Sequence, residues 1–140
     1  MREYIRHPSS IPLEVKIADL PNPQSEYMNN ISLGGLSFHS KNKLDDGALI
    51  VIRIPMLKEN IQINGQVAWC RKHESSYEVG VRFRDREEAF RTRMVEQICH
   101  IEQYRREVME RERRQLTSEE AAIEWIKKYA ASFPELMMEV

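Results

Sequence analysis

The chain has 140 residues, of which 41% are hydrophobic and 31% are charged, a composition typical of one packed domain with a possible appendage. Its 21 basic and 22 acidic residues leave a net charge of -1. This argues against a protein that binds a nucleic-acid backbone over a broad basic face. The first residues lack the apolar core of a signal peptide, and no apolar run is long enough to cross a membrane. We therefore expect a cytoplasmic protein, with no membrane insertion, whose Cys70 and Cys99 stay reduced.

Short strands dominate the first 85 residues. After an N-terminal arm, residues 13–17 alternate between apolar and charged side chains, as a half-buried strand does. Residues 21–26, PNPQSE, are expected to form a loop. A β-branched run at 48–55 ends at a proline, and residues 77–83 alternate without a break. Several short strands within about 80 residues predict a small antiparallel barrel or sandwich.

Glycines mark the turns and interruptions of these strands. Asp46-Gly47 predicts a turn, whereas Asn64-Gly65 is either a hairpin turn or a bulge. Gly34 and Gly35 interrupt the strand-like stretch NNISLGGLSF at 29–38. Glycines inside a strand indicate a bulge, or a place where another group approaches the backbone.

The pattern becomes helical after Asp85. No glycine or proline occurs from 87 to about 114, and five apolar residues recur there at helical spacing: Phe90, Met94, Ile98, Ile101 and Val108. This predicts one amphipathic helix about 40 Å long, whose first half packs on the barrel. Its second half is too polar to be buried along its length, and Arg105 at a core position argues against a long coiled coil.

A second helix is predicted from about 118 to 131. Thr117 precedes it, and Glu120 stands at the capping-box position. We therefore divide the chain into a β-domain at 1–85 and a helical extension at 86–140.

Two patterns of polar residues stand out in the β-domain. Arg2 and Arg6 are four residues apart in the arm, and Asn30, Ser32 and Gly35 form an Asn-x-Ser-x-x-Gly motif. Taken alone, two arginines at this spacing often occur by chance, and the motif is typical of a turn followed by a bulge. Asn30-x-Ser32 is also a formal glycosylation sequon, but that reading needs a secreted protein.

Together and in this order, R-x-x-x-R and N-x-S-x-x-G resemble the signature of the PilZ domain, a bacterial receptor for cyclic di-GMP. The later stretches VAWCRK and YEVGVRF look like the last strands of that family. The resemblance covers about residues 2–85. It implies a six-stranded antiparallel barrel followed by a helix, with cyclic di-GMP as the ligand and no other cofactor.

The resemblance also implies a ligand-binding set: Arg2, Arg6, Asn30, Ser32, Gly34 and Gly35. An arginine fork can bond two phosphate oxygens, or O6 and N7 of guanine, which a lysine cannot do. Asn30 would accept from a guanine N–H, and Ser32 would meet a phosphate. The two glycines would let the ligand approach the backbone closely. Many relatives carry aspartate at Asn30; an amide offers one acceptor oxygen instead of two, which predicts weaker binding.

Trp69 and Arg71 are weaker candidates. Trp69 lies in the strand that the family places beside the ligand, but a core or rim position is the simpler interpretation, and Arg71 reads first as an exposed strand residue. A zinc site from Cys70, His73, Cys99 and His100 is not expected, because the last two are adjacent on a helix and diverge by about 100°. No nucleophile–base constellation stands out, so we expect no enzyme and no metal.

We expect the arm to become ordered when ligand binds, and a downstream protein to recognise the new surface. The resemblance implies second-messenger signalling in motility or biofilm control. The alternative is a PilZ-like adaptor that has lost ligand binding and controls pili or motility through protein contacts. The downstream partner, the ligand stoichiometry and a possible homodimer stay open.

Overall fold

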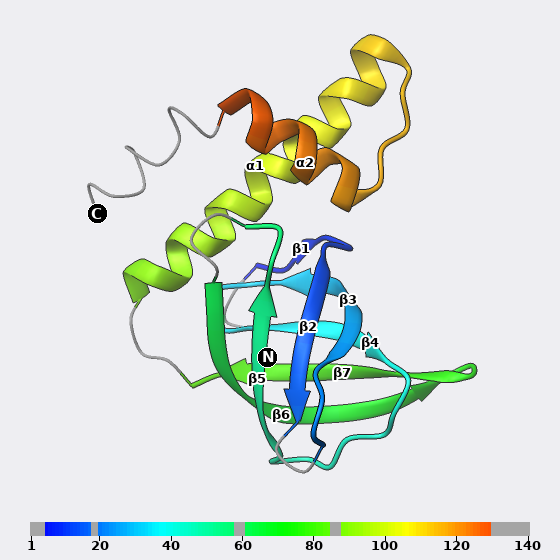
Figure 1. Cartoon of the computed structure of the whole chain (residues 1–140), viewed down its shortest axis with the longest axis vertical. Coiled ribbons are helices and arrows are strands. Elements are labelled where there is room, and N and C mark those ends of the chain that lie inside the picture. Colours follow the sequence, from blue (N-terminus) through cyan, green and yellow to red (C-terminus); the bar gives the residue numbers. More distant parts are fainter. Residues whose placement is uncertain (1–4, 18–19, 58–60, 85–87, 130–140) are drawn as a thin grey trace.

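A closed β-barrel carries a helical hairpin in the part of the chain that the computed structural model describes, residues 5–17, 20–57, 61–84 and 88–129. The strands are β1 (His7–Pro8), β2 (Pro12–Ile17), β3 (Gln24–Ile31), β4 (Gly35–Ser40), β5 (Leu49–Ile54), β6 (Ile61–His73) and β7 (Ser76–Phe83). Neighbours pair antiparallel in the order β3-β2-β5-β6-β7-β4, and β4 returns to β3 to close the ring (Figure 1). The predicted six-stranded antiparallel barrel is confirmed. The two-residue β1 pairs with β3 beside this ring.

Alternation along the strands builds the barrel interior. In β2, Leu13 and Val15 are each 1% exposed, while Glu14 between them points outward. The same period of two buries one face of β5 and of β7. Closing the sheet removes its unpaired edges, which would otherwise be open to pairing with other chains.

Two sequence expectations about the strands are wrong. The stretch 21–26 is not all loop, because β3 begins at Gln24 and pairs its first residues with β2. Asn64-Gly65 forms neither a turn nor a bulge: both residues lie inside the long strand β6, whose register shifts between Val67 and Trp69 instead. Local polarity suggested turns at both places, and pairing with a neighbouring strand overrode it.

Other expectations about local structure hold. Gly47 has φ of +87°, which confirms the turn at Asp46-Gly47 and explains its glycine. Thr117 and Glu120 form the predicted capping box: the Thr117 N–H donates to Glu120 Oε1 at 2.8 Å, and the Glu120 N–H donates to Thr117 Oγ1 at 3.0 Å.

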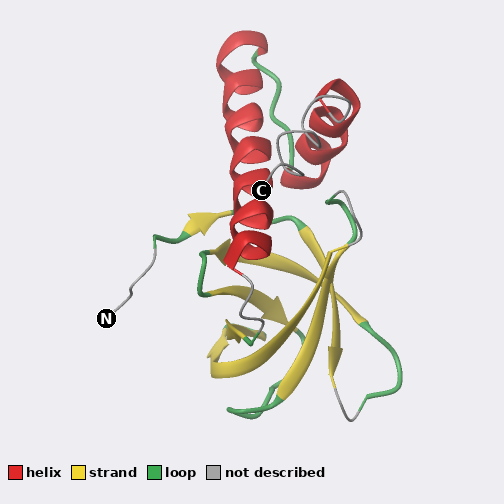
Figure 2. Cartoon of the chain, turned by 90° about the vertical axis from the view of Figure 1, so that its left-hand side faces the viewer, coloured by secondary structure: helices red, strands yellow, loops and turns green. Residues whose placement is uncertain are grey.

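The helices are α1 (Glu88–Glu112) and α2 (Ser118–Tyr129), close to the predicted bounds. In both views one end of α1 lies beside the barrel, and α2 folds back against α1 (Figures 1 and 2). The apolar stripe of α1 is buried at Met94, Ile98, Ile101 and Val108, whereas the side chain of Phe90 falls outside the described residues. Neither described helix is long and apolar enough to span a membrane.

The second half of α1 is polar on one side only. Tyr104 is 7% exposed and Val108 is 3% exposed; on α2, Trp125 is 6% exposed. The Trp125 indole stacks on the His100 imidazole of α1, with ring centroids 6.1 Å apart. The second half of α1 is therefore stabilised by packing against α2. The sequence alone left open what this half of the helix packs against.

Candidate functional site

The arginine arm and the Asn-x-Ser-x-x-Gly motif meet where β1 lies along the end of β3. Pro8 pairs with Asn30, and His7 pairs with Ile31. Just before this pairing, Arg6 Nη1 donates to Asn30 Oδ1 at 2.7 Å, across 24 residues of sequence. Two patterns that are separate in the sequence thus become one polar cluster. Arg2, the other predicted arm arginine, lies outside the described residues.

Ser32 holds the turn between β3 and β4. Its backbone N–H donates to the Gly35 carbonyl at 2.8 Å. Its hydroxyl accepts from the Gly34 N–H at 3.2 Å and donates to the Gly35 carbonyl at 3.3 Å. Ser32 is 5% exposed. A short hydroxyl that bonds to nearby backbone groups is what a tight turn of this kind needs.

The last glycine of the motif, Gly35, is required by the barrel itself. A Cβ on Gly35 would collide with the carbonyl oxygen of Val81 on the neighbouring strand β7. The Gly34 carbonyl accepts from the Phe83 N–H at 3.0 Å. The close approach that Gly35 permits is therefore an approach of β7, which is a structural reason for the glycine that the sequence did not reveal.

Strand pairing extends the cluster into a row across the outer face of the barrel. Asn30 pairs with Ser37, Ser37 pairs with Gly80, and Gly80 pairs with Trp69. Directly paired residues point to the same face, and the residues that flank Ser37 and Gly80 are buried inside. Three strand spacings of about 4.8 Å make the row about 14 Å long. We call these four residues the outer row.

Trp69 closes the far end of the outer row. A Cβ on Gly80 would collide with the Trp69 indole, so this glycine makes room for the ring. The indole is half-buried, and the Arg71 guanidinium lies 4.2 Å from its ring centroid. Arg71 also lies 4.0 Å from Glu78 Oε1. The outer row thus has an arginine at each end, Arg6 beside Asn30 and Arg71 beside Trp69.

Sequence reasoning missed Ser37 and Gly80. Both are small residues between buried neighbours, in LSF and in VGV, a signal that is visible in the sequence but not specific. Ser37 is fully buried and accepts a hydrogen bond from Asn29 Nδ2 at 3.2 Å. Only the register of β4 and β7 shows that they join Asn30 to Trp69.

The thiols and imidazoles do not form a metal centre in the described residues. Cys70 and Cys99 are free and half-buried, and burial raises the pKa of the Cys99 thiol. Within that part of the chain, no group of three or more His, Cys, Asp or Glu side chains is placed to hold a metal ion.

A groove of about 600 Å³ lies on the helical hairpin. It is lined by Arg105, Arg106, Met109, Glu110, Gln115, Leu116 and Thr117. None of the predicted ligand-binding residues lines it, so the hairpin and the outer row are separate surfaces.

Comparison with known families decides the identity of the fold. The family model of the PilZ domain matches residues 1–99. The chain belongs to the PilZ domain family. The match ends within α1, so the second half of that helix and all of α2 lie beyond the PilZ match. No curated protein matches the chain.

Solved PilZ structures are similar to the chain. The PilZ domain of YcgR from Escherichia coli with c-di-GMP shares 17% identity and a TM-score of 0.63, over 79% of this chain and 98% of that one. The PilZ domain of CeSA from a cellulose-synthesizing bacterium shares 22% identity and a TM-score of 0.53, over 65% and 94% of the two chains. The MrkH–c-di-GMP complex of K. pneumonia shares 16% identity and a TM-score of 0.55, over 74% and 55%. At these identities the likeness supports the fold.

Proposed function

We propose that this PilZ protein is a receptor for cyclic di-GMP. The observation that carries the proposal is the 2.7 Å hydrogen bond between Arg6 and Asn30, which joins the arm to the Asn-x-Ser-x-x-Gly motif. YcgR and MrkH, which share the fold, have been solved with c-di-GMP, and this chain has R-x-x-x-R and N-x-S-x-x-G intact.

Each residue of the site has a distinct role in this proposal. The guanidinium of Arg6 bonds a phosphate or the O6 and N7 edge of a guanine, and Arg2 adds a second fork. Asn30 accepts from a guanine N–H. Because the Ser32 hydroxyl is engaged in the turn between β3 and β4, its role is to hold the shape of that turn next to Asn30. Trp69 and Arg71 are secondary candidates at the other end of the outer row.

Binding requires a local exchange of hydrogen bonds. A ligand held by both Arg6 and Asn30 replaces the bond between their side chains with bonds to itself, so these two side chains have to turn towards the ligand. We propose that the bound ligand orders the arm in its place along β3, and that arm and ligand together create a surface for a downstream protein. The protein is then a cytoplasmic receptor that signals by conformation and has no catalytic step.

Calorimetric titration with cyclic di-GMP tests the proposal, with GTP and cyclic di-AMP as controls. A bidentate arginine contact contributes about 1–3 kcal/mol, so Arg6→Ala is expected to weaken binding about five- to hundredfold. Arg6→Lys should weaken it too, because an ammonium cannot reproduce the fork. Arg53→Ala is the matched control, because it removes the same charge from β5, which neighbours neither β3 nor β4.

Two outcomes would refute receptor function as proposed. The first is folded wild-type protein that gives no heat of binding with cyclic di-GMP, which would show that it is not a receptor for this ligand. Equal losses in Arg6→Ala and Arg53→Ala would mean that net charge, and not the site, governs binding.

The alternative is an adaptor that works through protein contacts without ligand. The groove on the hairpin favours it, because this groove lies beyond the family match at residue 99 and offers an apolar strip, including Met109 and Leu116, between charged side chains. A negative titration of folded protein would turn attention to that surface.

A further inference from the structure

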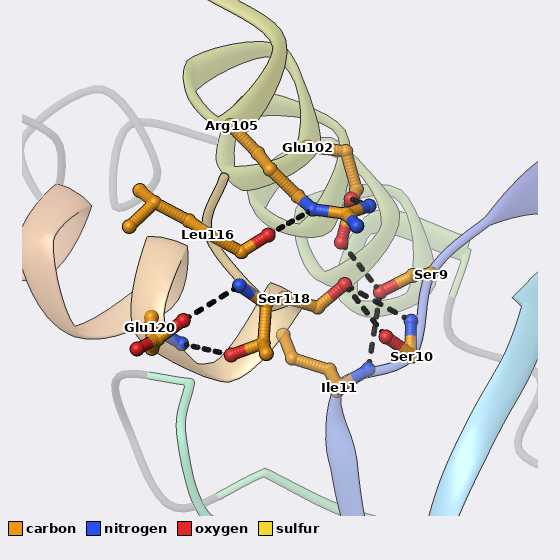
Figure 3. Close-up of polar contacts among 9 residues, drawn as sticks. Ser9, Ser10, Ile11, Glu102, Arg105, Leu116, Ser118 and Glu120 are labelled. Carbon is orange, nitrogen blue, oxygen red and sulfur yellow. Dashed lines mark hydrogen bonds and ion pairs between the residues drawn. The ribbon is translucent and has the colours of Figure 1, made fainter. Parts of the chain in front are cut away.

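The N-terminal arm is tied directly to the helical hairpin (Figure 3). Ser9 Oγ donates to Glu102 Oε2 on α1 at 2.9 Å. The backbone N–H and the hydroxyl of Ser10 both donate to Ser118 Oγ, at the start of α2, at 3.1 Å and 3.0 Å. We call these three hydrogen bonds the arm clamp. They join segments that are 93 and 108 residues apart in the sequence.

The arm clamp is buried at Ser9, Glu102 and Ser118, whereas Ser10, which donates two of its three hydrogen bonds, is exposed. Ser9 is 5% exposed, Glu102 is 6% exposed and Ser118 is fully buried. When such bonds break without room for water, the separated polar groups lose their partners and gain no hydration. The Ser9–Glu102 bond, which is buried at both ends, therefore resists partial separation of the arm from the hairpin.

The clamp continues into the loop between the helices. Glu102 Oε1 lies 3.5 Å from Arg105 Nη1, and Arg105 Nε donates to the Leu116 carbonyl at 2.6 Å. Figure 3 shows Ser9, Glu102, Arg105 and Leu116 in sequence along this path. Arg105 and Leu116 also line the groove of about 600 Å³, so the path leads from the arm to that surface.

A stiff segment connects the clamp to Arg6. Only His7 and Pro8 separate Arg6 from Ser9, and both pair with β3. The Ser9 N–H donates to the Asn29 carbonyl at 3.3 Å, and proline fixes its own φ. At about 3.3 Å per residue, Arg6 and Ser9 are about 10 Å apart along the strand. Because this segment is held by strand pairing, a movement of the backbone at Arg6 also moves Ser9.

We propose that the arm clamp couples cyclic di-GMP binding at Arg6 and Asn30 to the position of the α1–α2 hairpin. This inference rests on the proposed receptor function. In this structure the arm is paired with β3 while the clamp is formed, so a ligand that binds this arrangement stabilises the clamp, and the clamp increases ligand affinity by the same factor. Glu102 and Ser118 both lie beyond residue 99, so the device uses the part of the chain outside the PilZ match.

Hydrogen exchange on the full wild-type chain is the first test. Cyclic di-GMP is expected to slow exchange in residues 5–11 and also at the start of α2, residues 118–124, which the ligand does not touch. Ligand binding that protects the arm but leaves α2 unchanged overturns the coupling and leaves the receptor function intact. Wild-type protein that binds no cyclic di-GMP overturns both.

Ser118→Ala and Thr117→Ala separate coupling from helix stability. Ser118→Ala removes the acceptor of both Ser10 bonds and is expected to weaken cyclic di-GMP binding at least about fivefold. Thr117→Ala removes the capping bond to the Glu120 N–H from the same helix start, at an exposed residue outside the clamp. Its affinity should stay within about twofold of wild type, a change well below the usual range of coupling.

The pattern of the two variants decides the outcome. Equal affinity losses would show that only the stability of α2 matters, and a wild-type affinity in Ser118→Ala would show that the clamp is passive. If Ser118→Ala does not fold, the exchange experiment on the wild-type chain still decides the proposal.

Discussion

Gly35→Ala tests whether the last glycine of the motif serves the barrel or the ligand. An added Cβ would collide with the Val81 carbonyl oxygen and lie 3.1 Å from its carbonyl carbon and 3.4 Å from Arg82 Cα. All three obstacles are backbone atoms of a strand that pairs with β4, so no side chain can rotate away. Strands β4 and β7 would have to separate locally.

The expected cost is large relative to total stability. Overpacking typically costs about 1–3 kcal/mol of folding stability. Because the obstacle here is rigid backbone, we expect Gly35→Ala to cost about 3 kcal/mol. For a chain of this length each kcal/mol shifts the melting midpoint by about 4 °C, so we expect a loss of about 12 °C. Thermal denaturation followed by circular dichroism, with no ligand present, measures it.

Gly47→Ala is the matched control. Nothing lies within 4 Å of its added Cβ, but its φ of +87° is strained for alanine, so we expect a loss of about 1 kcal/mol. A Gly35→Ala protein that melts within about 2 °C of wild type, and loses only ligand affinity, would refute the packing argument and restore the ligand as the reason for this glycine.

Two further predictions concern carboxylates outside the site. Burial raises the pKa of Glu26 above its ordinary 4.5, against the opposing hydrogen bond from the Lys41 N–H, so the stability of the fold falls as pH rises above 4.5 through the folded pKa. Glu26→Gln should therefore melt higher than wild type at pH 7, an advantage that shrinks towards pH 4; equal midpoints at pH 7 would contradict this. The hydrogen bond from Arg114, aided by Tyr104, lowers the pKa of Glu124 to about 2, so its contribution is present above pH 4.5 and is lost as pH falls towards 2. In urea denaturation, Glu124→Gln should be less stable than wild type at pH 6, and a difference that persists unchanged at pH 3 would argue against this ion pair.

Local patterns were sufficient for most of the elements. Alternation located β2 and β7, a β-branched run located β5, and a long stretch without glycine or proline located α1 almost to its ends. The capping box at Thr117 and the turn at Gly47 followed from the chemistry of a few adjacent residues. These features depend on contacts within a few residues, which is the range over which a single sequence is informative.

The start of β3 and the interior of β6 could not be read in the same way. Gln24 and Ser25 are polar, yet they are held extended by pairing with β2. Asn64-Gly65 is a typical turn pair, yet it is held extended between β5 and β7. Pairing with a distant strand outweighs local preference there, because it satisfies every backbone group along the edge.

By itself, the sequence determined the class of the fold and the identity of the polar residues at the candidate site. Arg6, Asn30 and Ser32 were singled out as candidates by their types and spacing, which resemble the PilZ signature. Tertiary structure alone decided which residues meet: the outer row from Asn30 to Trp69, the reason for Gly35, and the arm clamp from Ser10 to Ser118. These depend on strand register and on contacts between residues up to 108 positions apart, which no local period or motif records.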